Sequence, residues 1–206
     1  MFAQFLSGSL KTAKNVILLA LLASVLSGCA AALIGGAAVG GNSLANRRTL
    51  GTQIDDETIE NRIHYKAKSA LKGSPSASAY SPSLSIVSYN RRVLLLGHVA
   101  SESDRQLVEQ VARQDDNVKD VYNHIVVTPM ARSMLDASND TWITTKLRTR
   151  LLNVAGVYAG HVKVVTYNSV VYVMGMLTPQ QQADVNQVVS TTAGVQKVVT
   201  LYENYP

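Results

Sequence analysis

The sequence of 206 residues is poor in cysteine and in charge, and both shortages narrow what the protein can be. One cysteine excludes an internal disulfide and any metal site built from several cysteines. Charged residues make up 16% of the chain and hydrophobic residues 47%, which excludes a largely disordered protein. The apolar stretch Val16–Leu26 is too short to cross the roughly 30 Å of hydrocarbon in a bilayer.

Motifs of catalysis, metal binding and nucleotide binding are missing too. The chain has neither a Gly-x-Ser-x-Gly turn nor a phosphate-binding Gly-x-x-x-x-Gly-Lys-Ser/Thr loop. The acid clusters Asp55–Glu57 and Asp115–Asp116 are explained by helix starts and turns. The histidines show no metal-ligand spacing; they are His64, His98, His124 and His161. We therefore expect a non-enzymatic protein with no catalytic residue, no metal site and no cofactor.

The N-terminus has the pattern of an export signal. Lysines, the apolar stretch Val16–Leu26 and small residues follow one another, which predicts a signal peptide over residues 1–28. Leu26-Ser-Gly-Cys29 resembles the lipobox of bacterial lipoproteins, which implies acylation of Cys29, and Ala30 in place of aspartate implies export to the outer membrane. Residues 29–50 are expected to form a flexible tether, rich in alanine and glycine. A transmembrane anchor and a cleaved, unattached protein remain alternatives.

The net charge of +5 raises the question of nucleic acid binding. Basic residues occur singly or in pairs such as Arg47–Arg48 and Arg91–Arg92, and never in runs of five or more. An exported lipoprotein also meets little nucleic acid. Three cations of the second half, Lys146, Arg148 and Arg150, gather on one expected helix. The charge therefore favours an anionic lipid surface as the partner, with no nucleic acid.

Two stretches of the chain are similar, and they predict an internal repeat. Tyr89-Asn90 and Gly97 in the first recur as Tyr167-Asn168 and Gly175 in the second, each within a β-branched segment that indicates a hairpin. An amphipathic helix is expected before each hairpin, opened by the acids Asp55–Glu57 in one copy and by Asn139-Asp140 in the other.

A second helix and a closing strand are expected after each hairpin. The helices begin at Ser101 and Thr178, and the strands cover Val118–Val127 and Val195–Leu201. The chain is thus predicted to be α+β, with the element order α-β-β-α-β occurring twice. In each copy a small mixed sheet is expected to pack against two helices. The first copy has an additional loop at Ser74–Ser83. The predicted boundaries are a first domain at 51–128, a linker at 129–137 and a second domain at 138–206.

The repeat resembles tandem BON domains, through the strand glycine and the closing V-x-x-V pattern of Val118/Val121 and Val195/Val198. The segments Gly51–Asp56 and Ala137–Lys146 resemble the dual-BON outer-membrane lipoproteins. This resemblance implies a lipoprotein on the periplasmic face of the outer membrane that binds phosphatidylglycerol or cardiolipin through the first helix of its second domain. It further implies enrichment at the division septum, support of envelope integrity, and the outer-membrane protein assembly machinery as a partner.

The helix that the resemblance singles out has two distinct faces. Ile143, Leu147 and Leu151 form the expected core stripe, and the lone Trp142 lies on another side. The expected phospholipid-binding residues are Thr141, Trp142, Thr145, Lys146, Arg148, Thr149 and Leu152. The first repeat has Thr58 in place of Trp142, and its face is expected to lack an aromatic residue. Two alternatives stay open: either Trp142 is a core residue wedged against the first repeat, or the face docks a protein, as in a periplasmic adaptor for assembly or peptidoglycan machinery.

Overall fold

The computed structural model describes residues 46–75, 82–128, 130 and 132–206. The predicted signal peptide and Cys29 lie outside the described residues, as do most of the tether and of the Ser74–Ser83 loop. Residues 45–206 form a compact unit. In it the first repeat comprises α3 (Leu50–Lys72), β1 (Ser83–Tyr89), β2 (Arg92–Val99), α4 (Glu102–Arg113) and β3 (Asp120–Val127).

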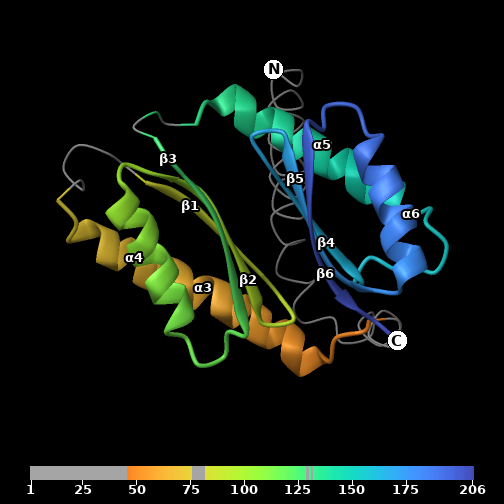
Figure 1. Cartoon of the computed structure of the whole chain (residues 1–206), viewed down its shortest axis with the longest axis horizontal. Coiled ribbons are helices and arrows are strands. Elements are labelled where there is room, and N and C mark those ends of the chain that lie inside the picture. The colour runs from red at the N-terminus through yellow and green to blue at the C-terminus, as the bar shows by residue number, and fades with distance from the viewer. Residues whose placement is uncertain (1–45, 76–81, 129, 131) are drawn as a thin grey trace, which may run out of the picture. The chain divides into compact units, whose positions relative to one another are not determined.

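The second repeat has the same order of elements (Figure 1). It comprises α5 (Met134–Leu151), β4 (Val162–Tyr167), β5 (Val170–Leu177), α6 (Pro179–Ser190) and β6 (Lys197–Asn204). In both repeats the first two strands pair antiparallel and the second and third pair parallel, which gives two mixed three-stranded sheets. The predicted α+β fold, with two α-β-β-α-β units, is confirmed.

Each hairpin closes through a two-residue turn with positive φ at both positions. The φ values are 52° and 64° at Asn90 and Arg91, and 50° and 60° at Asn168 and Ser169. Turns of this kind match the right-handed twist of the paired strands, and asparagine tolerates the left-handed conformation well. The recurring Tyr-Asn dipeptide therefore marks the hairpin turn, as predicted.

The recurring glycine is required by close backbone approach. A Cβ at Gly97 would lie 2.0 Å from the carbonyl oxygen of Ser83, and one at Gly175 would lie 2.8 Å from that of His161. Gly97 also has φ of 133°, which residues with a side chain rarely adopt. Glycine is thus needed at both sites, and the constraint is more severe at Gly97.

The acids that were expected to open the first helix of each repeat lie inside the helix, so that prediction is wrong. α3 begins at Leu50 with Thr49 as its N-cap, and α5 begins at Met134 with Ser133 as its N-cap. Each hydroxyl accepts a hydrogen bond from a backbone N–H of the first turn, so capping does not need the later acids. The start of α5 falls inside the segment that was predicted to be the 129–137 linker.

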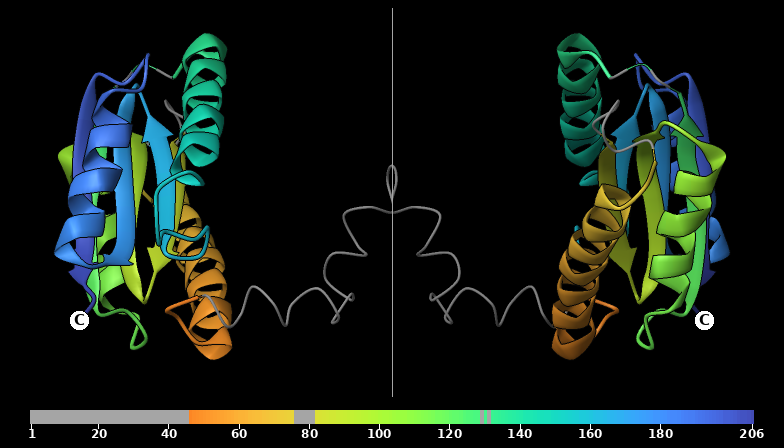
Figure 2. Two further views of the ribbon diagram at one scale, coloured as in Figure 1. Left: turned by 90° about the vertical axis from the view of Figure 1, so that its right-hand side faces the viewer. Right: turned by 90° about the vertical axis from the view of Figure 1, so that its left-hand side faces the viewer.

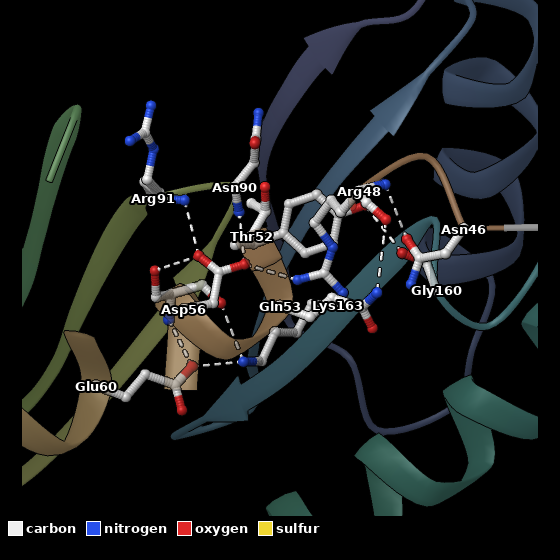
Figure 3. Close-up of polar contacts among 12 residues, drawn as sticks. Asn46, Arg48, Thr52, Gln53, Asp56, Glu60, Asn90, Arg91, Gly160 and Lys163 are labelled. Atoms are coloured by element: carbon white, nitrogen blue, oxygen red, sulfur yellow. Dashed lines mark hydrogen bonds and ion pairs between the residues drawn. The ribbon is translucent and has the colours of Figure 1, made fainter. Parts of the chain in front are cut away.

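Asp56 and Asp140 are buried, and each accepts hydrogen bonds from the hairpin turn of its own repeat. Asp56 accepts from the backbone N–H groups of Asn90 and Arg91 at 2.9 and 2.7 Å (Figure 3). Asp140 does the same for residues 168 and 169 at 2.6 and 2.8 Å. An arginine eight residues earlier, Arg48 or Arg132, pairs with each carboxylate. Helix, hairpin and the segment before the helix are joined at one point in both repeats.

Three hydrophobic clusters hold the compact unit together. One lies between the helices and sheet of each repeat. The third joins the two sheets, and its aromatic members are Tyr89, Tyr167 and Tyr172. The layers are thus helices, sheet, sheet, helices, and Figure 2 shows α3 and α5 toward the same edge of the two sheets. Polar contacts supplement this cluster: the hydroxyl of Tyr89 donates to the carbonyl of His161 at 2.8 Å.

Candidate functional site

The helix α5 places its two faces as the sequence predicts. Ile143, Leu147 and Leu151 are buried in the core of the second repeat. Since these residues recur every four positions, they form one buried stripe, and residues about half a turn away from it lie on the outer side of the helix. Six of the seven expected binding residues are exposed, and Lys146 is partly exposed; the exposed ones are Thr141, Trp142, Thr145, Arg148, Thr149 and Leu152.

Trp142 is a surface residue. It is 54% exposed, so the alternative that it is wedged into the core is wrong. The ammonium nitrogen of Lys146 lies 4.5 Å from the centre of the Trp142 ring, at cation–π distance. An indole with an open flank and a cation over it can lie at a boundary between water and an apolar phase.

The three threonines of this face have satisfied hydroxyl groups. The hydroxyls of Thr141, Thr145 and Thr149 donate to the carbonyl oxygens four residues earlier, at 2.9, 2.9 and 3.1 Å. Burying an unpaired hydroxyl is costly, whereas a hydroxyl already bonded to the helix loses little when water leaves. These threonines therefore tolerate an apolar surrounding.

The charges that follow Trp142 along α5 have one sign. From Thr141 to Leu152 the sequence contains Lys146, Arg148 and Arg150 and no carboxylate. Arg150 donates to the hydroxyls of two threonines, at 191 and 192. Within the described part of the chain, no acid pairs with Lys146, Arg148 or Arg150. This part of α5 is thus suited to an anionic surface.

The exposed surface of α5 extends one turn further than the sequence indicated. Leu135 is 83% exposed and lies two turns before Trp142 on the same face. Together with it, exposed residues spaced three and four apart form the α5 stripe, defined as Leu135, Ser138, Trp142, Thr145, Thr149 and Leu152. Leu135 was missed because the helix was expected to open at Asn139. The signal was present in Ser133-Met-Leu-Asp136, which has the form of a helix N-terminal capping motif.

The equivalent face of α3 is different in charge and in its aromatic residue. Thr58 follows Asp56 as Trp142 follows Asp140, and Arg62, at the position of Lys146, pairs with Asp115 at 2.5 and 2.7 Å. The expectation that this face lacks an aromatic residue is wrong. Tyr65 lies two turns after Thr58 and is 77% exposed. Tyr65 occupies the position of Thr149, one turn beyond that of Lys146.

Other site types have little support in the described part of the chain. Residues 46–75, 82–128, 130 and 132–206 contain no group of three histidine, cysteine or acidic side chains that could hold a metal ion. Nor does any helix in these ranges have the length and apolar character needed to span a membrane.

Comparison with known proteins places these features in a family. The BON domain profile matches residues 55–129 and 139–201, one match in each repeat. The chain belongs to the BON domain family. It is 35% identical over 178 residues to the outer membrane lipoprotein DolP of Haemophilus influenzae, covering 86% of this chain and 89% of that protein. Each repeat is therefore one BON domain, and the chain is similar to DolP over most of its length, as its sequence suggested.

Two further similarities are more distant. A 21 kDa hemolysin of Actinobacillus pleuropneumoniae is 33% identical over 152 residues, which is 74% of this chain and 75% of the hemolysin. Among solved structures, CdsD, a structural protein of the type III secretion system of Chlamydia trachomatis, is 13% identical with a TM-score of 0.31. That alignment covers 70% of this chain and 92% of the CdsD chain.

Proposed function

We propose that this dual-BON lipoprotein binds anionic phospholipid, phosphatidylglycerol or cardiolipin, through the α5 stripe. The binding is non-catalytic, takes place on the periplasmic face of the outer membrane, and enriches the protein at the division septum in support of envelope integrity. The observation that carries the proposal is the half-exposed Trp142 on an uncharged stripe flanked by Lys146 and Arg148, with no carboxylate from Thr141 to Leu152.

The energetics of this face agree with shallow insertion. Trp142 and Leu152 present apolar surface, and about 25 cal/mol for each Å² removed from water is a typical gain. Indole rings are favoured at the headgroup level of a bilayer. Each lysine or arginine near an anionic surface adds about 1 kcal/mol. Since the three threonines keep their hydrogen bonds within the helix, insertion leaves none of their hydroxyls unpaired.

The lipid anchor supplies the second membrane contact. Acylation of Cys29 would attach the chain to the outer membrane, because each buried CH₂ contributes about 0.8 kcal/mol. Fully extended, the segment from Cys29 to Asn46 spans at most about 60 Å. Asn46 lies against Gly160, in the loop that follows α5. The anchor thus keeps the protein on the membrane, and the α5 stripe selects where on that membrane it stays.

The α3 face favours a second candidate function. Ile54 and Tyr65 are exposed there, and Arg62 is neutralised by Asp115. Exposed aromatic residues are enriched in protein contacts. The alternative is therefore an adaptor that uses α3 to bind the outer-membrane protein assembly machinery or peptidoglycan machinery.

Vesicle flotation of residues 30–206, which carry no acyl group, tests the phospholipid proposal. We expect flotation with phosphatidylglycerol vesicles and none with phosphatidylcholine vesicles. Trp142→Glu should abolish it, while Thr58→Glu, the same change at the equivalent position of α3, should have little effect. Equal flotation with both lipids, or equal loss in both variants, would contradict the proposal.

In cells, the two membrane contacts can be separated. Trp142→Glu should abolish septal enrichment and leave the protein in the outer-membrane fraction. Cys29→Ala should abolish labelling with palmitate and stable membrane attachment. Septal enrichment of the Trp142→Glu protein would count against the α5 stripe, and membrane attachment of the Cys29→Ala protein would favour a transmembrane anchor.

A further inference from the structure

A groove lies beside the C-terminal half of α5 and is closed on its other side by the segment from Val157 to Val164. Its volume is about 600 Å³. Pockets for small molecules commonly measure about 300–1,000 Å³. Thr145, Thr149 and Leu152 belong both to this groove and to the α5 stripe. The groove therefore opens onto the proposed membrane-binding face.

One part of the groove is apolar. Val157 and Val164 are buried in the core of the second repeat, and Leu152 and Tyr158 are exposed at its rim. Water in contact with such a wall is released when an apolar chain covers it, which favours binding. A ligand without an apolar portion, such as inorganic phosphate, would leave this wall wet.

The charged part of the lining is cationic. Arg48, Arg148 and Lys163 line the groove, and its described lining residues include no carboxylate. Two of the three cations are neutralised by ion pairs with carboxylates of α3. Arg48 pairs with Asp56 at 2.8 Å, and Lys163 pairs with Glu60 at 2.5 Å (Figure 3). Arg148 is exposed and has no ion pair with any described residue. The groove thus has one uncompensated cation beside an apolar wall.

We propose that this groove binds a single anionic phospholipid molecule, with the phosphate at Arg148 and one acyl chain along the wall formed by Leu152, Val157 and Val164. The proposal rests on the function proposed above and deepens it: the α5 stripe enters the bilayer surface, and the groove takes one lipid from it. A site of this kind distinguishes lipid molecules by stereochemistry and headgroup, whereas insertion of the stripe alone responds to the surface charge.

Titration with a short-chain lipid separates the two kinds of binding. Dihexanoyl phosphatidylglycerol, added to residues 30–206 below its critical micelle concentration, should shift the backbone amide signals of residues 157–164 in a saturable manner, with one lipid for each protein. Dihexanoyl phosphatidylcholine and inorganic phosphate should bind at least about fivefold more weakly, because the first lacks a net charge and the second lacks a chain. Shifts confined to the α5 stripe, or equal affinity for any of these probes, would overturn the proposal.

Two pairs of variants give matched controls. Arg148→Gln and Arg150→Gln each remove one cation from α5, but only Arg148 lines the groove. We expect about a tenfold weaker affinity for the short-chain lipid in Arg148→Gln and a much smaller change in Arg150→Gln. Ala159→Phe fills the groove, while Ala155→Phe adds the same ring in the same loop outside it; only the first should abolish binding. Equal effects within either pair would contradict the proposal.

Vesicle flotation distinguishes failure of this inference from failure of the proposed function. If Ala159→Phe and the unaltered chain both float with phosphatidylglycerol vesicles but neither binds the short-chain lipid, the groove proposal is wrong and the stripe proposal stands. If the unaltered chain does not float with these vesicles, the proposed function itself fails.

Discussion

The two repeats share their framework and differ on the outer face of the first helix. Asp56 and Asp140 hold the hairpin turns in the same way, and both carboxylates pair with an arginine eight residues before them. At the equivalent position of the two helices, α3 exposes Thr58 and α5 exposes Trp142. The comparison teaches that the residues repeated in the sequence are those that hold the fold, while the residues that differ define the surface available for binding.

The largest effect is expected where the repeats are most alike. Asp56→Ala and Asp140→Ala should each lower the free energy of unfolding by about 3–5 kcal/mol, because a partly buried arginine and two backbone N–H groups lose their acceptor. Urea unfolding of each variant measures this. A loss below about 1 kcal/mol in one variant only would show that the two hairpins are held differently, and would break the comparison.

The glycines should reveal a graded difference within the shared framework. Gly97→Ala should destabilise the protein more than Gly175→Ala, because its Cβ approaches a carbonyl oxygen more closely and its φ is positive. We expect a loss of about 3 kcal/mol or more for Gly97→Ala, and a smaller loss for Gly175→Ala. Unfolding midpoints in urea give the order, and a reversed order would contradict this account of the close approach.

Exchange of Trp142 and Thr58, the residues that differ, should change lipid binding and leave the free energy of unfolding nearly unchanged. Trp142→Thr should weaken binding to phosphatidylglycerol vesicles about tenfold or more, through lost apolar area, and change the free energy of unfolding by less than about 0.5 kcal/mol. Thr58→Trp should not transfer binding to α3, since Asp55 and Glu57 are exposed beside it. If the protein that carries both exchanges still floated with these vesicles, that result would contradict the role given to the cations of α5.

The smallest expected effect is a weak loss of stability in acid at the interface between the sheets. Burial, and then the charge of Arg132, lowers the pKa of His98, and burial and then Lys197 lower the pKa of His124. Their neutral forms are thus favoured in the folded protein, so this stability is present above about pH 6.5 and is lost as the pH falls.

Urea midpoints at pH 7.5 and 5.0 measure this loss, with the double variant His98→Gln and His124→Gln as the comparison. The second repeat has Met176 and Leu201 at the equivalent positions, so neither histidine has a counterpart there. An unchanged pH dependence in the double variant would assign the effect to other groups.

Much of the fold was predictable from the sequence because short-range patterns determine it. The Tyr-Asn dipeptides give the hairpins, the recurring glycines mark close backbone approach, and Thr178-Pro179 gives the start of α6. The sequence predicts too late a start for α5, because Asn139-Asp140 resembles a helix opening. The real function of Asp140 depends on a hairpin 28 residues away, which no local pattern reveals.

The candidate site was predictable in part for the same reason. Periodicity placed Trp142 and Leu152 away from the core stripe, and the structure confirms that both are exposed. The groove could not be predicted, because it brings Arg48 and Lys163 to α5 from distant parts of the chain. Whether Arg148 was neutralised also depended on tertiary contacts.

The most direct test of the central claim uses Trp142 as a probe, since it is the only tryptophan in the chain. Residues 30–206 are mixed with phosphatidylglycerol vesicles whose acyl chains carry bromine, which quenches tryptophan fluorescence on close contact. The account predicts a blue shift and strong quenching with these vesicles, and neither with brominated phosphatidylcholine. Fluorescence that stays unshifted and unquenched while the protein floats with phosphatidylglycerol vesicles would show that the contact lies elsewhere, and would contradict the claim.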